Sequence, residues 1–85
     1  MNILDIISLD DDKTYIVGAK ADTFNTNYYC LLNKDKLDEV IICKSVDEET
    51  LKEENNPDVI KELMPIFYKS INKEEIMEKL QELNN

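Results

Sequence analysis

The chain has no histidine, no arginine and no tryptophan, and it has one glycine and two cysteines among 85 residues. Without histidine it cannot supply an imidazole base, a histidine-activated nucleophile or an imidazole metal ligand. One glycine is too few for a phosphate-binding or dinucleotide-binding loop, and without arginine no bidentate clamp can hold a phosphate. We therefore predict that the protein is not an enzyme, and that it has no catalytic residues, no cofactor and no bound metal.

The two thiols, Cys30 and Cys43, are not spaced as a metal knuckle. A structural zinc site needs about four ligands, and two lone cysteines do not provide them. A disulfide across a hairpin is geometrically conceivable, but the N-terminus shows no signal peptide, and cysteines in the cytoplasm stay reduced. We predict a cytoplasmic protein in which both cysteines are free and act as small apolar residues of a sheet.

The formal net charge is −9, and lysine supplies every positive charge. No apolar run approaches the roughly 18 to 20 residues that span a bilayer. So acidic a chain repels nucleic-acid backbones and anionic membranes, and we predict that it binds neither directly. The simplest role of the acidity is solubility. The expected partner is another protein with a basic or an apolar surface.

The pattern is strand-like up to about residue 45. Aspartates in "DDDK" (10–13) predict a turn; a calcium loop is the weaker alternative, because Tyr15 stands where such a loop needs glycine. Gly18 lies inside a strand-like segment and predicts a bulge or a close backbone approach. A polar connection is expected over 22–27. The predicted strands are residues 2–9, 14–21, 28–33 and 39–45.

The last two of these strands form a predicted hairpin whose register depends on the loop length. An even loop puts Cys30 and Cys43 on one face, whereas an odd loop puts them on opposite faces. We predict the even loop. In either case Tyr28 and Tyr29 lie on different faces and both faces are apolar. One face is expected to carry the helices, and the other is either covered by a thin second layer or is a contact surface.

Three helices are possible after residue 45. Ser45 and Glu48 resemble a capping box, which predicts a short helix with only Leu51 to bury. Asn56, followed by proline, predicts the start of a second helix. We expect that helix to end near residue 64, because Pro65 removes a hydrogen bond. Residues 66–70 are either extended or a kinked continuation.

The last helix carries the strongest start signal. Asn72 is its predicted cap, with Glu75 closing a capping box. Ile76, Leu80 and Leu83 form one apolar stripe, which we expect to be buried against the sheet.

Together these signals predict one α+β domain over residues 1–85, since a chain of this length forms a single small core. The predicted sheet has three or four mainly antiparallel strands within residues 2–45. Two or three helices within residues 46–84 are expected to pack on it.

Two segments carry a likeness to a known family: "YYCLLN" (28–33) with "DEVIICK" (38–44), and "SINKEEIMEKL" (70–80). The chain resembles a family of small acidic uncharacterised proteins of Gram-positive bacteria, defined as a domain of unknown function. The resemblance covers about half of the chain and implies a β-rich middle followed by an amphipathic helix. It implies no activity.

Two functions are compatible with these features. The first is a small protein-binding or regulatory module without catalytic activity, in which Tyr28 or Tyr29 anchors a partner. The alternative is an acidic inhibitor that mimics nucleic acid and blocks a nuclease or another nucleic-acid enzyme, as phage anti-defence proteins such as anti-CRISPRs do. Glu74, Glu78 and Glu82, which share one helix face, would then imitate phosphates. The same glutamates are also typical of the solvated face of an amphipathic helix.

Overall fold

A computed structural model of the chain describes residues 1–48 and 50–84. It confirms the α+β class, with one antiparallel sheet whose strands follow chain order and two helices after it. The described residues form five strands rather than the predicted three or four. The elements are β1 (Ile6–Ser8), β2 (Thr14–Thr23), β3 (Thr26–Asn33), β4 (Val40–Ser45), β5 (Leu51–Glu53), α1 (Pro57–Ser70) and α2 (Lys73–Asn84).

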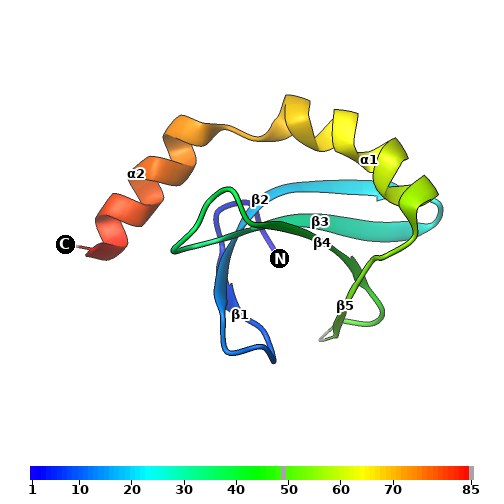
Figure 1. Cartoon of the computed structure of the whole chain (residues 1–85), viewed down its shortest axis with the longest axis horizontal. Coiled ribbons are helices and arrows are strands. Elements are labelled where there is room, and N and C mark those ends of the chain that lie inside the picture. Colours follow the sequence, from blue (N-terminus) through cyan, green and yellow to red (C-terminus); the bar gives the residue numbers. More distant parts are fainter. Residues whose placement is uncertain (49, 85) are drawn as a thin grey trace.

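The sheet curls so that its two faces differ, and both helices lie along its convex side (Figure 1). Helix α1 buries Leu63 and Phe67 against one part of the sheet. Helix α2 buries Ile76 and Leu80 against another part of the same face. No helix residue belongs to the apolar cluster on the concave face. The helical layer therefore covers only one side of the sheet. Neither α1 nor α2 is long and apolar enough to cross a membrane.

The aspartate-rich turn between β1 and β2 forms as predicted. The Leu9 amide donates to the Lys13 carbonyl, and the Lys13 amide donates to a side-chain oxygen of Asp11. Asp12 takes a left-handed conformation (φ 62°), which aspartate tolerates better than most residues. The next connection is shorter than the predicted 22–27, because the adjacent Phe24 and Asn25 both take positive φ. This is a two-residue hairpin turn that lets β2 and β3 pair up to its edge.

Gly18 marks a bulge in β2, in agreement with the sequence prediction. The register of β2 against β3 shifts between Val17 and Ala19. A Cβ atom at position 18 would collide with the Leu32 side chain. The absence of a side chain at the bulge therefore leaves the space that the Leu32 side chain occupies.

The predicted register of the β3–β4 hairpin is wrong. Cys30 lies opposite Ile42, so Cys43 lies on the other face of the sheet. The cause is an odd loop, closed by a hydrogen bond from the Asn33 amide to the Glu39 carbonyl. The buried Asn33 side chain holds this loop, because its oxygen accepts from two loop amides and its NH₂ donates to Glu39. The Asn33 side chain thus fixes the length of the loop. That length places the two thiols on opposite faces of the sheet.

The predicted short helix after Ser45 is wrong as well. The Ser45 hydroxyl donates to the Asp47 carbonyl, and the chain turns back to pair β5 with β4. A segment with Leu51 as its one apolar residue gains little as an amphipathic helix. As a strand it satisfies backbone groups of β4 and places Leu51 on the concave face.

Helix α1 begins where predicted but ends later. The Asn56 side chain accepts from the Asp58 amide at 3.0 Å. The helix continues through Pro65 to Ser70, so residues 66–70 are helical and not extended. Proline costs one hydrogen bond, but Leu63 and Phe67 lie on either side of it and are almost fully buried. Their burial holds both halves of the helix on the sheet.

Helix α2 also begins at its predicted cap, since the Asn72 side chain accepts from the Glu75 amide at 3.2 Å. Ile76 and Leu80 are buried, as predicted. Leu83 is 49% exposed, so its predicted burial is wrong. In Figure 1 the last turn of α2 extends past the sheet.

Candidate functional site

The concave face of the sheet carries an apolar cluster that no helix covers, and side chains of the sheet and of its edge strands bury the centre of this cluster. Its floor is made by buried side chains from the three central strands, Tyr15, Val17, Leu31 and Cys43. Partly buried side chains extend it toward both edges: Ile7, Leu9, Tyr29, Ile41 and Leu51. This face is the second apolar face that the sequence pattern predicted; no helix lies over it, and partly buried side chains cover its centre as a thin layer.

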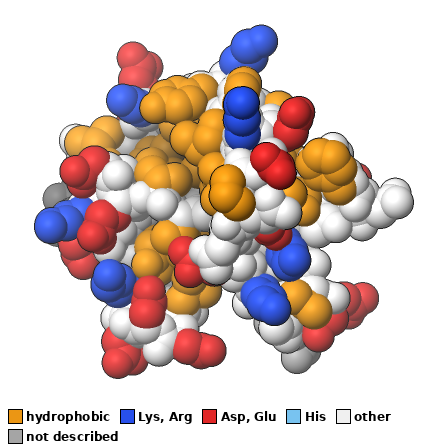
Figure 2. All heavy atoms as spheres, turned by 45° about the vertical axis from the view of Figure 1, so that its right-hand side comes forward, with side chains coloured by type: hydrophobic (Ala, Val, Ile, Leu, Met, Phe, Trp, Pro, Cys, Tyr) orange, Lys and Arg blue, Asp and Glu red, His pale blue; other side chains and the backbone are white. Residues whose placement is uncertain are grey.

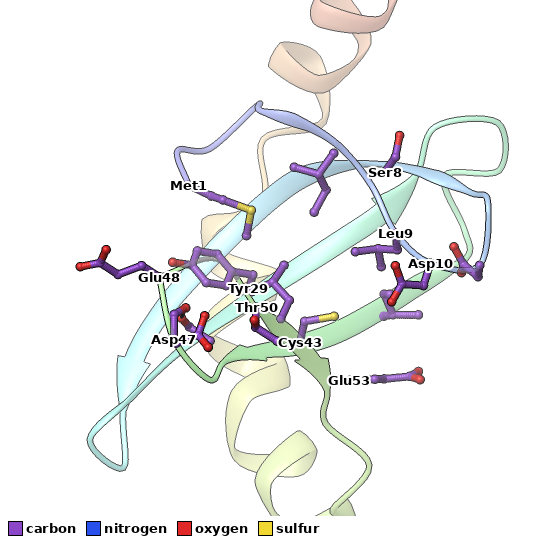
Figure 3. A pocket seen from close by; sticks show the side chains of 15 residues that line it. Met1, Ser8, Leu9, Asp10, Tyr29, Cys43, Asp47, Glu48, Thr50 and Glu53 are labelled. Carbon is purple, nitrogen blue, oxygen red and sulfur yellow. Dashed lines mark hydrogen bonds between the residues drawn. The ribbon is translucent and has the colours of Figure 1, made fainter.

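A hollow of about 600 Å³ lies over this floor. Figure 3 shows Tyr29 and Cys43 on the sheet, with Asp47 and Glu48 at the Tyr29 end and Asp10 at the opposite end. Figure 2 shows the underside of the molecule notched between two lobes, with carboxylates on both flanks. We call this feature the concave hollow. Of the four floor residues only Cys43 lines it, and its other apolar lining comes from Met1 and the partly buried side chains Ile7, Leu9, Tyr29, Ile41 and Leu51.

The rim of the concave hollow is acidic. No described residue that lines it is a lysine. Its five carboxylates come from the β1–β2 turn, from the β4–β5 loop and from β5: Asp10, Asp11, Asp47, Glu48 and Glu53. These positions are distant in sequence, and the curl of the sheet brings them around one opening. A negative rim over an apolar floor favours a ligand that is both apolar and positively charged.

Tyr29 is the aromatic side chain most available to a ligand in this hollow. It is half-buried, and it also lines a second hollow of about 600 Å³ beside the first, together with Met1 and Lys20. The neighbouring Tyr28 points to the opposite face, where it is buried under α1. Of the two candidate tyrosines, the structure thus makes only Tyr29 accessible.

The ionisable groups of the floor keep their protons at neutral pH. Burial, strengthened by a hydrogen bond to Asp11, raises the pKa of Tyr15 to about 12. Burial, together with the Glu53 and Asp11 carboxylates, raises the pKa of Cys43 to about 11. The pKa of Asp11 is lowered by hydrogen bonds from the Lys13 amide and the Tyr15 hydroxyl. The phenol of Tyr15 and the thiol of Cys43 are therefore both neutral and almost fully buried, and neither is activated as a nucleophile.

The three glutamates singled out from the sequence lie elsewhere. Glu74, Glu78 and Glu82 are exposed on α2, which packs on the convex face. The structure therefore separates them from Tyr29 by the thickness of the sheet. Within residues 1–48 and 50–84, no group of three or more acidic or cysteine side chains is arranged to hold a metal ion.

The sequence pattern indicated Tyr29 but gave no sign of the acidic rim. The carboxylates of the rim lie in a turn, a loop and a three-residue strand. Each of these segments has the local sequence of a polar connection. Only the presence of apolar residues on both faces of β3 and β4 indicated that a second apolar surface existed. No family model, no curated protein and no solved structure matches this chain. The resemblance to the Gram-positive family therefore stays a prediction.

Proposed function

We propose that this protein is a small non-catalytic binding module whose concave hollow receives a segment of a partner protein. The observation that carries the proposal is the apolar concave face, which both helices leave uncovered. The centre of this face is buried, but the apolar side chains around it, among them Tyr29, Ile41 and Leu51, are only partly buried, and a partner that covers them would gain the free energy of their further burial. A hollow lined by partly buried apolar side chains and rimmed by polar ones is a candidate interaction site.

The chemistry of the hollow specifies the partner segment. Its apolar side chains cover Tyr29, Ile41 and Leu51, which a partner can bury further. Tyrosine is frequent among the residues that contribute most to binding, because it offers a large rigid surface and a hydroxyl. Lysine or arginine beside the apolar anchors complements the acidic rim, and the net charge of −9 accelerates the encounter.

The protonated state of the floor supports a role without catalysis. At neutral pH the thiol of Cys43 and the phenol of Tyr15 carry their protons. We also propose a cytoplasmic location, because Cys30 and Cys43 are unpaired and lie on opposite faces of the sheet. Free cysteines persist in a reducing compartment.

The test begins with a random peptide display library selected on the immobilised protein. We expect the selected peptides to combine aromatic or branched apolar residues with lysine or arginine. A synthetic copy of the tightest binder is then titrated with the purified protein, and fluorescence anisotropy measures the affinity. Tyr29→Ala should cost about 2 kcal/mol, or roughly 30-fold in Kd, as expected for a tyrosine anchor.

The matched control is Tyr68→Ala. Tyr68 is 76% exposed on α1, away from the concave hollow, so its loss should leave the affinity within about twofold. If both tyrosine variants bind as well as the parent protein, the concave hollow is not the site.

The nucleic-acid mimic remains a prediction, and charge reversal separates it from the module. One triple variant reverses charges around the hollow (Asp10, Glu48 and Glu53 to lysine), and the other reverses α2 (Glu74, Glu78 and Glu82 to lysine). The hollow variant should lose the basic peptide and the α2 variant should keep it. The opposite result, with a basic nucleic-acid enzyme released by moderate salt as the main partner, would favour the mimic.

A further inference from the structure

The two edge strands of the sheet, β1 and β5, border the concave hollow from opposite sides. Residues of both strands line it, including Ile7 on β1 and Leu51 on β5. Each strand is three residues long and pairs only with its neighbour in the chain. Within the described residues, each therefore keeps one edge without a strand partner, and these two edges flank the apolar floor.

The ladder between β4 and β5 shows which backbone groups point outward. Hydrogen-bonded pairs alternate with non-bonded pairs in an antiparallel ladder. Thr50 and Glu54, on either side of β5, are both hydrogen-bonded to β4 or to the chain that follows it. Lys52 is two residues from each of them, so by the same alternation it is also hydrogen-bonded to β4. Leu51 and Glu53 then direct their N–H and C=O groups to the free edge. The flanking bonds run from the Val46 amide to the Thr50 carbonyl (2.9 Å) and from the Glu54 amide to the Ile42 carbonyl (2.8 Å).

The side chains at the β5 edge favour the same kind of ligand as the whole hollow, one that is both apolar and positively charged. Leu51 belongs to the apolar cluster of the concave face, and Glu53 stands on its rim. Glu48 and Glu53 make no hydrogen bond or ion pair with the part of the chain that the structure describes. A strand added here would lay alternate side chains over the floor and bring its cationic groups within reach of these two carboxylates.

We infer, building on the proposed function, that the partner segment binds as an extended strand along the free edge of β5. Its apolar side chains, at alternate positions, cover Tyr29, and its lysine or arginine side chains lie beside Glu48 and Glu53. The sheet then gains a sixth strand inside its own curl. Main-chain hydrogen bonds to Leu51 and Glu53 fix the register, and the hollow selects the side chains.

The opposite edge is less suited to the same ligand. By the same alternation, Ile6 and Ser8 of β1 direct their backbone groups outward. On that side, however, the Asp11 carboxylate is already held by the Lys13 amide and the Tyr15 hydroxyl. That leaves Asp10 on the β1 side of the rim, against the two carboxylates of Glu48 and Glu53 beside β5, so a cationic segment is attracted more strongly to β5.

The first experiment uses the peptide obtained from the display selection, resynthesised with one N-methyl group at each position in turn. A bound strand turns every second N–H toward β5, so N-methylation should weaken binding with a period of two. We expect about a tenfold loss at edge-facing positions and less than about a threefold loss at the others. Uniform or irregular effects would overturn the strand geometry.

The second experiment follows amide hydrogen exchange in the ¹⁵N-labelled protein with and without this peptide. The Leu51 and Glu53 amides should exchange at least about tenfold more slowly in the complex, and Lys52, already bonded, should change little. Protection of Ile6 and Ser8 instead would place the strand on β1 and overturn the inference.

A matched pair of variants tests the backbone directly. Glu53→Ala removes the carboxylate, whereas Glu53→Pro removes the carboxylate and the outward N–H, a change that an edge strand tolerates. The proline variant should bind the peptide about 2- to 10-fold more weakly than the alanine variant, with both unfolding at similar temperatures. Equal affinities would contradict a main-chain bond at this position.

These outcomes separate the inference from the proposed function. If Tyr29→Ala abolishes binding but neither the period of two nor protection at β5 is found, the module stands and the strand is wrong. If no selected peptide depends on Tyr29, both are wrong.

Discussion

The attachment of α2 to the sheet depends on two side chains, and truncating one of them tests this docking. Ile76 is 2% exposed and Leu80 is 8% exposed, and both pack against Ile16 and Leu32 of the sheet. Leu80→Ala removes most of a buried side chain and should cost about 2–4 kcal/mol in the free energy of unfolding. A domain of this size has roughly 4–13 kcal/mol in total, so the loss is a large share of its stability.

The cost of removing both side chains has an upper limit. Each buried aliphatic side chain contributes about 1.5–3 kcal/mol, and α2 has no other buried residue within its described part. Once both are truncated, the helix has nothing apolar to hold it and should detach while the sheet stays folded. The double variant Ile76→Ala/Leu80→Ala should therefore cost less than the sum of the single variants.

Urea titrations followed by far-ultraviolet circular dichroism and by tyrosine fluorescence measure the cost of the single truncation and that of the double truncation. The parent protein should show coincident transitions, and the double variant should lose helical signal at low urea before the tyrosine signal changes. Leu83→Ala is the matched control on the same helix. Since Leu83 is 49% exposed, its truncation should cost under about 1 kcal/mol. Fully additive costs with coincident transitions would refute the reasoning and show that α2 unfolds only with the sheet.

Two further predictions concern the buried titratable groups. Cys30 and Cys43 should react slowly with a thiol reagent at pH 8 in the folded protein, because they are buried with a pKa of about 11. A denatured sample should titrate two thiols per chain. Fast reaction of the folded protein, or an intramolecular disulfide, would contradict the register. Stability should also fall in alkali: the fold raises the pKa of Tyr15 from 10.0 to about 12, so its contribution is complete below pH 10 and is lost as the pH rises through 12. The two thiols act in the same direction between pH 9 and 11. Urea midpoints that stay constant from pH 8 to 11 would contradict this assignment.

Local signals predicted the elements well where a side chain caps its own neighbour. Asn56 and Asn72 mark the starts of both helices, and in the structure each accepts a hydrogen bond from the first turn. The aspartates of residues 10–13 likewise form their turn by bonding the adjacent backbone. These interactions span two or three residues, so the sequence alone determines them.

Features that depend on packing could not be predicted in this way. Helix α1 passes through Pro65 because Leu63 and Phe67 are buried on both sides of it, and Leu83 is 49% exposed in the last turn of α2, which extends past the sheet (Figure 1). The face on which Cys43 lies depends on one loop residue more or less. Each outcome is set by contacts between segments, which local propensity does not contain.

The candidate site combines both kinds of feature. Alternation along β3 placed Tyr28 and Tyr29 on different faces, which follows from strand geometry alone. Which tyrosine stays accessible depends on where α1 docks, and it docks over Tyr28. The acidic rim depends on the curl of the whole sheet, which brings a turn, a loop and a short strand together. A local sequence pattern therefore indicates the candidate tyrosine but not its surroundings.

The acidity of the chain can serve solubility and recognition at the same time. An open sheet with two unpaired edges invites pairing with another copy of itself, which natural proteins avoid with short edge strands and charges. Here β1 and β5 are each three residues long, and the carboxylates of Asp10, Glu48 and Glu53 stand beside them. Between two copies these charges repel each other across the edge, whereas a basic segment is attracted to the same place. A surface that excludes its own copies and admits a cationic strand needs no separate set of charges for each task. For this reason we do not treat solubility and binding as competing explanations of the negative charge near the hollow.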